Sequence, residues 1–552
     1  MKKKIKIFIC FLCFFLANTS SSNEITKKNF VINDLSKQPL AELGLANDES
    51  SPWKNFLEKH SFEEINKFFL NLPIKSPIPV VQDLIFEILI SEKNINKSIT
   101  EENDSVLFNT IISQLFNSGR FSEIERLYSK SSLLEDNQMI LTRMIESNFL
   151  RNQHTQACKI LDENIKEKPT ALGKVIIICD IINNRHEEAR FGLALLKEQN
   201  NPGDIFFIEL AYSLMSENNL SDSDYLSKIL NDVKELNPVV MTSLQFADIS
   251  PNFEQVENLN TSGLLFIISN PSVEIDLKIF CAEYLVKQGR IGFQILSEAY
   301  QLPMFENKEL ENSLRLYKTL APVKARPLLY QSILQDENPD SRYEKIRAFL
   351  RISSFENLET SIAFLVKDLV NNQDFIKTEE DIITFTKMYQ HTKNFDEAKT
   401  LVKKIENVNK KKLYQVLLEI SQFLNERTIN YPLIEGIISE NFIDGEMPDE
   451  FEEILLVILT NTDLTSELSQ ELLSYPKLID KKSIDFDLKK LLLAEKFSSD
   501  KDFFNSLKIF FSIVGNNEIN ELSVIEKFTI LVILKNLELN VQLNQFSARM
   551  LL

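Results

Sequence analysis

Residues 184–189 read Asn184-Arg185-His186-Glu187-Glu188-Ala189, a polar turn that leads through one bulky residue into a helical pattern. The same order recurs along the chain, and its bulky residues are Phe121, His154, His186, Leu220 and Phe395. The first four of them are separated by 33, 32 and 34 residues. One helix pair of this length cannot bury its apolar faces alone, so neighbouring pairs must stack and share a core. The pattern therefore predicts repeated helix pairs.

This pattern resembles the tetratricopeptide repeat, whose helix pair occupies 34 residues and has an alanine just inside its second helix. Ala157 and Ala189 hold that position. The resemblance covers residues 105–235 and the region around 380–405, with Gly289-Arg290-Ile291 as a weaker copy. The tryptophan and the glycine–tyrosine pair of the family are missing. The resemblance implies an all-α fold, an α-solenoid or superhelix of antiparallel helix pairs. We expect a bacterial, secreted protein.

Composition also favours helices. The chain has 552 residues and only 11 glycines, where roughly 7% of residues is usual. Dinucleotide-binding turns, phosphate loops and tight β-hairpins all require glycine, whereas helices need none. Two pairs, Ser61 with Glu64 and Ser122 with Glu125, have the spacing of helix capping boxes.

The first 22 residues predict a secretory signal peptide. Four lysines, at positions 2, 3, 4 and 6, precede an apolar run from Ile7 to Ala17, and small polar residues follow. As a helix this run rises about 16 Å, which is too short for a bilayer core of roughly 30 Å. An uncleaved N-terminal anchor is the alternative. We expect an exported, periplasmic or secreted protein with no stable membrane insertion after signal cleavage.

The rest of the chain divides at two weakly periodic stretches, residues 248–262 and 441–448. We expect these breaks to separate the chain into four parts after the signal peptide, although one curved array describes the pattern equally well. They are a flexible lead over residues 23–50, N-terminal repeats over 51–247, a middle helical array over 263–440 and a C-terminal helical array over 449–552.

Three cysteines follow the signal peptide, and two of them are candidates for a disulfide. Cys158 and Cys179 are equidistant from the turn at Lys168-Pro169, so in an antiparallel helix pair their sulfurs lie opposite each other. An oxidising compartment would make a bridge persistent. Two buried free thiols are the alternative, and Cys281 is expected to be a small core residue.

Residues that could perform chemistry are not arranged in known motifs. None of the four histidines has metal-site spacing with another histidine or a cysteine, and no nucleophile elbow or phosphate loop occurs. Acidic clusters such as Glu379-Glu380-Asp381 lie at expected helix starts, where carboxylates stabilise the helix dipole. We predict no catalytic residue, no cofactor and no metal. The net charge of −19 disfavours nucleic acid and anionic lipid as partners.

These patterns favour a non-enzymatic scaffold or adaptor that binds a protein or peptide partner on a helical-repeat surface in the cell envelope. The excess of carboxylates suggests a basic or neutral partner. One alternative is the helical superhelix of a cell-wall hydrolase resembling the soluble lytic transglycosylases. Glu49-Ser50 and Glu146-Ser147 provide the catalytic pair of that family, but neither is followed by its Gly-Leu-Met-Gln stretch. A structural subunit of an envelope complex is the other alternative.

Overall fold

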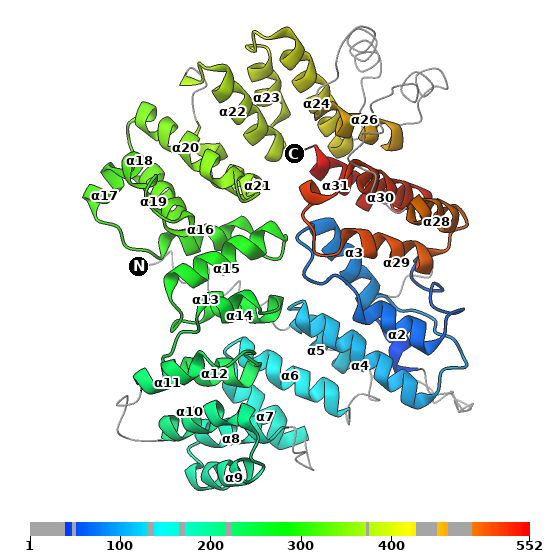
Figure 1. Ribbon diagram of the computed structural model, residues 1–552, viewed down its shortest axis with the longest axis vertical. Coiled ribbons are helices and arrows are strands. Elements are labelled where there is room, and N and C mark those ends of the chain that lie inside the picture. The colour runs from blue at the N-terminus through cyan, green and yellow to red at the C-terminus, as the bar shows by residue number, and fades with distance from the viewer. Residues whose placement is uncertain are drawn as a thin grey trace, which may run out of the picture. The chain divides into compact units, whose positions relative to one another are not determined.

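The computed structural model describes residues 39–46, 51–130, 137–164, 172–215, 223–370, 375–426, 450–461 and 488–551. Within these ranges every regular element is a helix, and the only extended pairing is an isolated bridge between Ala46 and Ser91 (Figure 1). The predicted all-α fold is confirmed for this part of the chain. None of its helices is both long and apolar enough to cross a membrane. The predicted signal peptide lies outside the described ranges.

Helices follow one another through short connections, and most pack on their neighbours in sequence. Those before residue 250 are η1 (Leu40–Glu42), α2 (Phe62–Leu70), α3 (Pro79–Ile90), α4 (Glu101–Asn117), α5 (Phe121–Lys130), α6 (Gln138–Leu150), α7 (His154–Asn164), α8 (Gly173–Ile182), α9 (His186–Glu198), η4 (Pro202–Asp204), α10 (Ile205–Met215), α11 (Ser223–Leu230) and α12 (Pro238–Phe246).

The next group of helices extends to residue 402. It comprises α13 (Phe253–Glu257), α14 (Thr261–Ser269), α15 (Ile275–Lys287), α16 (Phe293–Gln301), α17 (Asn307–Glu311), α18 (Ser313–Leu316), α19 (Pro322–Gln335), α20 (Pro339–Ser354), α21 (Glu359–Val366), η5 (Lys367–Leu369), α22 (Glu379–His391) and α23 (Phe395–Val402). The last group comprises α24 (Val408–Glu426), α26 (Glu450–Asn461), α28 (Leu488–Ser499), α29 (Phe503–Val514), η9 (Ile519–Glu521), α30 (Val524–Asn536) and α31 (Asn540–Met550).

One turn geometry joins helices at intervals along the chain. A residue with positive φ ends the first helix, and the amide of the following residue donates to a carbonyl five residues back, which is the Schellman arrangement. The copies found from sequence have the positive φ at Gly119, Asn152, Asn184, Gly289 and Lys393. In four of these copies the bulky residue comes next but one and opens a helix: Phe121 begins α5, His154 begins α7, His186 begins α9 and Phe395 begins α23. Leu220 lies outside the described ranges.

One of the two predicted capping boxes is present. The Ser61 side chain accepts from the Glu64 amide, and the Glu64 carboxylate accepts from the Ser61 amide. The box predicted for Ser122 and Glu125 is wrong. With Ser122 as the N-cap the helix would begin at Glu123, whereas α5 begins at Phe121. Ser122 therefore lies inside the helix, and Glu125 pairs instead with Arg151.

Part of the lead that we expected to be flexible is packed. In residues 39–46 the short helix η1 presents the amides of Leu40 and Ala41 to the Asp104 carboxylate of α4, at 2.6 and 2.9 Å. Ala41 is buried. The prediction of a flexible lead over residues 23–50 is therefore wrong for residues 39–46, because Asp104 satisfies the free amides of η1.

The stretch predicted as a break at residues 248–262 contains α13 and the start of α14. It contacts α4, since Asn260 donates to the Asn117 side chain at 2.9 Å and Ser262 donates to the Phe116 carbonyl. Residues Pro39–Leu552 form one compact unit. The other expected break, at 441–448, lies outside the described ranges, so the division into three arrays stays a prediction.

The last helices pack on the first ones. Figure 1 shows α29 and α31 beside α2 and α3. The ring of His60 stacks on Phe504 of α29 with 3.8 Å between ring centres, and Trp53 meets Phe503 edge to face at 5.8 Å. On α31, Gln542 donates to the Glu87 carboxylate of α3 at 3.2 Å. Residues far apart in sequence thus close the helical array on itself.

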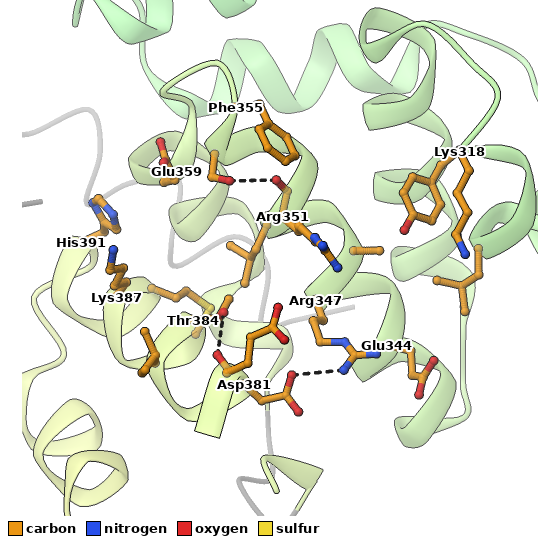
Figure 2. Close-up of a pocket in the computed structure, with 18 residues that line it drawn as sticks. Lys318, Glu344, Arg347, Arg351, Phe355, Glu359, Asp381, Thr384, Lys387 and His391 are labelled. Carbon is orange, nitrogen blue, oxygen red and sulfur yellow. Dashed lines mark hydrogen bonds and ion pairs between the residues drawn. The ribbon is translucent and has the colours of Figure 1, made fainter. Parts of the chain in front are cut away.

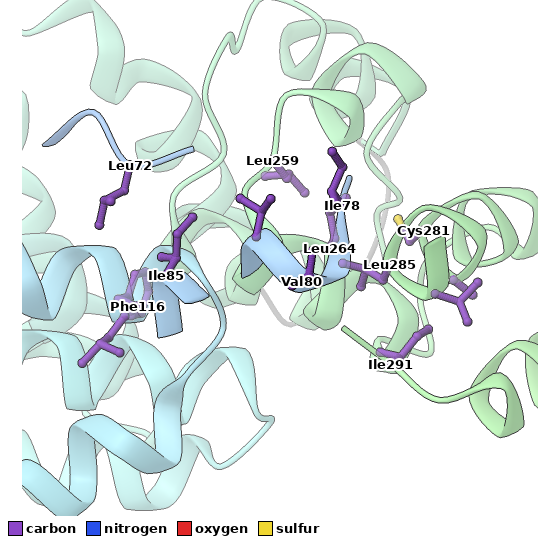
Figure 3. Packing of buried hydrophobic residues seen from close by; sticks show 14 of the residues in the cluster. Leu72, Ile78, Val80, Ile85, Phe116, Leu259, Leu264, Cys281, Leu285 and Ile291 are labelled. Carbon is purple, nitrogen blue, oxygen red and sulfur yellow. The ribbon is translucent and has the colours of Figure 1, made fainter. Parts of the chain in front are cut away.

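Helix α3 runs through the interior of the N-terminal region. Figure 3 shows Ile85 on the side of Phe116 from α4, and Val80 on the side of Leu264 from α14 and Leu285 from α15. All five side chains are buried. Since a fully buried aliphatic or aromatic side chain contributes about 1.5–3 kcal/mol, these residues are a main reason why the helices before and after α13 form one core.

Lys93, just after α3, is a fully buried lysine. Its ammonium group donates to the carbonyls of Ser91 at 2.7 Å and Leu89 at 3.4 Å. Burial lowers the pKa of Lys93 from 10.5 to about 7. Below that value the amine is charged in the folded and the unfolded chain alike. Above it only the unfolded chain keeps the proton, so stability rises with pH up to the unfolded pKa.

This lysine gives a testable pH dependence. Between about pH 6.5 and pH 8.5 its titration is expected to raise the free energy of unfolding by about 2 kcal/mol. Lys93→Met should remove that rise, which urea unfolding at both pH values would measure. An equal pH dependence in the wild type and the variant would contradict the assignment.

Candidate functional site

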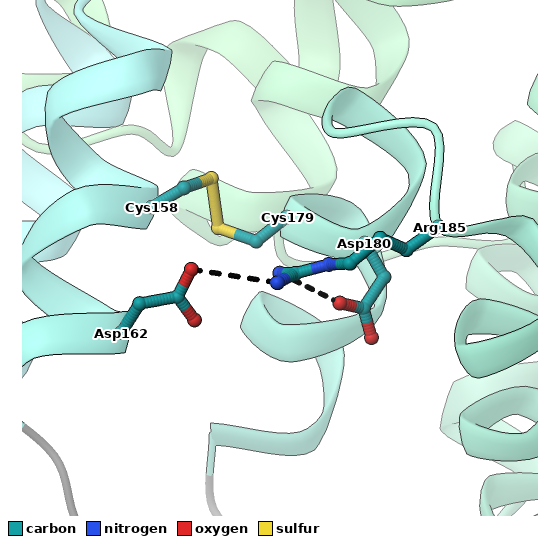
Figure 4. The surroundings of a disulfide bond; sticks show 5 residues. All are labelled: Cys158, Asp162, Cys179, Asp180 and Arg185. Carbon is teal, nitrogen blue, oxygen red and sulfur yellow. Dashed lines mark ion pairs between the residues drawn. A yellow bond between two sulfur atoms is a disulfide. The ribbon is translucent and has the colours of Figure 1, made fainter.

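The two candidate disulfide cysteines lie opposite each other in the α7–α8 helix pair. A disulfide joins Cys158 to Cys179, whose Cα atoms are 5.4 Å apart (Figure 4). Beside it, Arg185 from the turn after α8 pairs with Asp180 at 2.8 Å and with Asp162 of α7 at 3.6 Å. The bond and the ion pairs hold the two helices together, which is a structural role.

Removing this bond has a predictable cost. Cys158→Ser combined with Cys179→Ser is expected to lower the free energy of unfolding by about 3 kcal/mol, because the unfolded chain then gains loop entropy. Chemical unfolding of the oxidised protein and the variant measures the difference. Thiol labelling of the denatured, unreduced mature protein should find one free cysteine, Cys281. Three free thiols would contradict the bond.

The remaining predicted positions are not brought together into a reaction centre. Cys281 is buried, and burial raises the pKa of its thiol, which disfavours the reactive thiolate. His154 packs against Phe246 with 4.8 Å between ring centres, and burial lowers its pKa. His186 serves as the first residue of α9. Within the described ranges no group of three or more His, Cys, Asp or Glu side chains could hold a metal ion.

Of the two Glu-Ser pairs that could resemble the catalytic pair of a cell-wall hydrolase, Glu146-Ser147 lies in the described ranges, and both residues make contacts within their own helix. Glu146 on α6 forms an ion pair with Arg143 at 2.5 Å, and Ser147 is buried and donates to the carbonyl of Arg143 at 2.5 Å. The other pair, Glu49-Ser50, lies outside the described ranges. These contacts tie both Glu146 and Ser147 to their own helix.

A pocket of about 520 Å³ opens between α18, α20 and α22 (Figure 2). Its lining combines charges of both signs with apolar side chains. The charged residues are Lys318, Glu344, Arg347, Arg351, Glu359, Glu380, Asp381 and Lys387, and the apolar ones include Leu314, Tyr317, Phe355 and Met388. Side chains from α18, α20 and α22, together with Glu359 of α21, line this accessible space.

One ion pair fixes the wall between α20 and α22. Arg347 donates to the Asp381 carboxylate at 3.2 Å, as Figure 2 shows. Asp381 lies in the first turn of α22, where Thr378 caps the helix by accepting from the Asp381 amide at 3.1 Å. The helix dipole and Arg347 both stabilise this buried carboxylate. The pair therefore positions the two helices on either side of the pocket.

A partly buried hydrogen-bond chain ends at His391, one of the residues that line the pocket. Arg549 of α31 donates to the Thr360 hydroxyl at 2.8 Å, and that hydroxyl is 2.9 Å from Nδ1 of His391. Burial, together with the charges of Arg549 and Lys387, lowers the pKa of His391 to about 3. The His391 ring is therefore neutral at neutral pH.

The rim of the pocket is accessible and partly apolar. Phe355 is 79% exposed although it is a large aromatic residue. Three exposed cations, Lys318, Arg351 and Lys387, form no ion pair with another residue in the described ranges. A surface with an open aromatic ring and unpaired charges can bind a chain segment that carries an apolar side chain and polar neighbours.

Sequence reasoning did not find this pocket. The sequence feature nearest to the pocket is the acidic cluster at the start of α22, and its position at a helix start is explained by the helix dipole alone. No family model matches the chain, and no curated protein or solved structure matches it either.

Proposed function

We propose that this chain is an exported, non-enzymatic scaffold or adaptor of the cell envelope. In this proposal the helix pairs form a TPR-like solenoid that presents the pocket between α18, α20 and α22 to a protein or peptide partner. The observation that carries it is the exposed Phe355 ring on the rim of a pocket whose walls carry unpaired charges. Export is proposed from the N-terminal sequence pattern alone.

The composition of the pocket indicates what kind of segment it would bind. Cations and carboxylates are equal in number in its lining, so the pocket does not share the acidic character of the whole chain. Phe355, Tyr317 and Leu314 offer apolar contact, and Arg351 and Lys387 offer charged donors. We therefore propose an extended peptide with one large apolar side chain and an adjacent carboxylate.

The ionisation of His391 in the pocket supports binding over catalysis. A general base works best with a pKa near the ambient pH, whereas the pKa of His391 is about 3. Asp381 is committed to its ion pair with Arg347. Both polar groups are thus held in place by their partners, which suits a rigid binding surface.

Peptide display against the purified mature protein tests this proposal. Enriched peptides should lose affinity about tenfold or more for Phe355→Ser and Arg351→Glu, because each variant removes a direct contact. Two exposed residues outside the pocket provide controls, Met304→Ser and Arg190→Glu, which should bind as the wild type does. Equal affinity in pocket and control variants, or no enrichment at all, would contradict the proposed site.

A structural subunit of an envelope complex is the second candidate function, and one observation favours it. Phe191 and Leu195, one turn apart on α9, are 67% and 46% exposed, an apolar stripe of the kind that a fixed partner covers. A fixed-ratio complex that survives purification would favour the subunit, and an exchangeable partner would favour the adaptor.

A further inference from the structure

Two arginines from separate helix turns approach the same face of α3. Each directly follows a glycine with positive φ, 71° before Arg120 and 67° before Arg290. Arg290 donates from Nη2 to the side-chain oxygen of Gln82. The guanidinium carbon of Arg120 lies 3.9 Å from the ring centre of Phe86. Two copies of the repeated turn thus direct their arginines to one helix.

The two guanidinium groups lie close together. Gln82 and Phe86 are four residues apart in α3, so their side chains are neighbours on one face, about 5–6 Å apart at Cβ. Burial, and next the charge of Arg120, lower the pKa of Arg290 to about 10. Arg290 thus remains charged at neutral pH, and the two guanidinium groups repel each other.

The chain offers little compensation for this charge. Neither arginine forms an ion pair with another residue in the described ranges. The exposed Asp83, which follows Gln82 in α3, is the carboxylate whose charge favours the protonated form of Arg290. The Nε–H groups of Arg120 and Arg290 are both buried without a hydrogen-bond partner. Buried donors are normally satisfied, so this arrangement points to a missing acceptor.

We propose that Arg120 and Arg290 form a binding site for a small oxyanion of the phosphate class. Guanidinium groups bind phosphate and sulfate through paired, charge-assisted hydrogen bonds. A dianion would offset both positive charges and bridge the α4–α5 and α15–α16 turns across α3. None of these residues lines the pocket between α18, α20 and α22, so this site is separate from the proposed peptide site.

Titration of the mature protein with inorganic phosphate tests the proposal. Isothermal calorimetry and thermal unfolding are followed at constant ionic strength, with chloride replacing phosphate in the reference. The wild type should bind phosphate saturably. Arg290→Gln and Arg120→Gln should each weaken binding about tenfold or more, because each removes a charged donor. Arg315→Gln, at an exposed arginine of α18, is the control and should bind like the wild type.

Asp83→Asn is expected to change the affinity for phosphate in the opposite direction. This test does not require the arginine variants to fold. Removing the competing carboxylate should tighten phosphate binding severalfold. Sulfate should compete with phosphate, since the site reads charge and geometry. The proposal is overturned by an absence of saturable binding to the wild type, by unchanged affinity in the arginine variants, or by unchanged or weaker affinity in Asp83→Asn.

Discussion

Arg326→Met is expected to lower the free energy of unfolding by about 3–5 kcal/mol, because it leaves a buried carboxylate without its cation. Arg326 is 1% exposed in α19 and donates to both oxygens of Glu283 on α15, each at 2.6 Å. The Tyr300 hydroxyl donates to the same carboxylate at 2.7 Å. Burial and the charge of Glu283 raise the pKa of Tyr300, so this hydroxyl stays a donor.

The neighbouring ion pair provides a matched control. Lys324, two residues before Arg326, pairs with Asp276 across the same two helices at 3.2 Å, but its side chain is 55% exposed. Lys324→Met should therefore cost less than about 1 kcal/mol. Urea unfolding of both variants measures the contrast.

A double variant separates the ion pair from simple packing. Replacing Arg326 and Glu283 together by methionine should restore much of the stability lost in Arg326→Met, since no buried charge is left unpaired. Glu356 also loses its contact with Arg326 at 2.9 Å, but its side chain is 44% exposed. A double variant less stable than Arg326→Met alone would contradict this explanation.

Phe504→Ala is expected to lower the free energy of unfolding by a similar amount, about 3–5 kcal/mol. Phe504 is 1% exposed and lies between His60 and Phe68, at ring-centre distances of 3.8 and 5.1 Å. The variant opens a cavity where α29 packs on α2. Hydrogen exchange should accelerate in both helices, although they are far apart in sequence.

The single tryptophan reports on the same contact. Trp53 is buried and meets Phe503, so its emission should shift to longer wavelength in Phe504→Ala. The control is Phe191→Ala on α9, where the ring is 67% exposed and the expected change in stability is within about 0.5 kcal/mol. Faster exchange in α29 without any change in α2 would show that the two ends of the array are not coupled.

Local features of the fold could be predicted from the sequence because they are encoded by adjacent residues. The turn before His186 and the capping box at Ser61 each depend on a few neighbouring side chains. Other copies of the same Schellman turn were missed. They have their positive φ at Asp248, Asn357, Lys501 and Glu538. Asp and Asn are enriched in this conformation, whereas Lys and Glu have no such preference, so the residue type gives no signal at Lys501 and Glu538.

Contacts between distant residues could not be predicted. The stacking of His60 on Phe504 and the chain from Arg549 to His391 join segments that are far apart in sequence, and nothing in the local pattern of either segment indicates the other. The pocket has the same origin, because Phe355, Arg351 and Asp381 look like ordinary helix residues until α20 and α22 are placed side by side. Periodicity predicts helices, whereas a site depends on their arrangement.

Site-specific photo-crosslinking in the cell tests the central claim, that the pocket between α18, α20 and α22 receives a partner, most directly. A photoreactive amino acid replaces Phe355 or Tyr317 in the pocket, or the exposed Met304 or Val541 outside it. The account predicts that both pocket positions capture the same polypeptide through one peptide segment, and that the outside positions do not. Equal capture at Met304 and Val541, or no capture from the pocket, would contradict it.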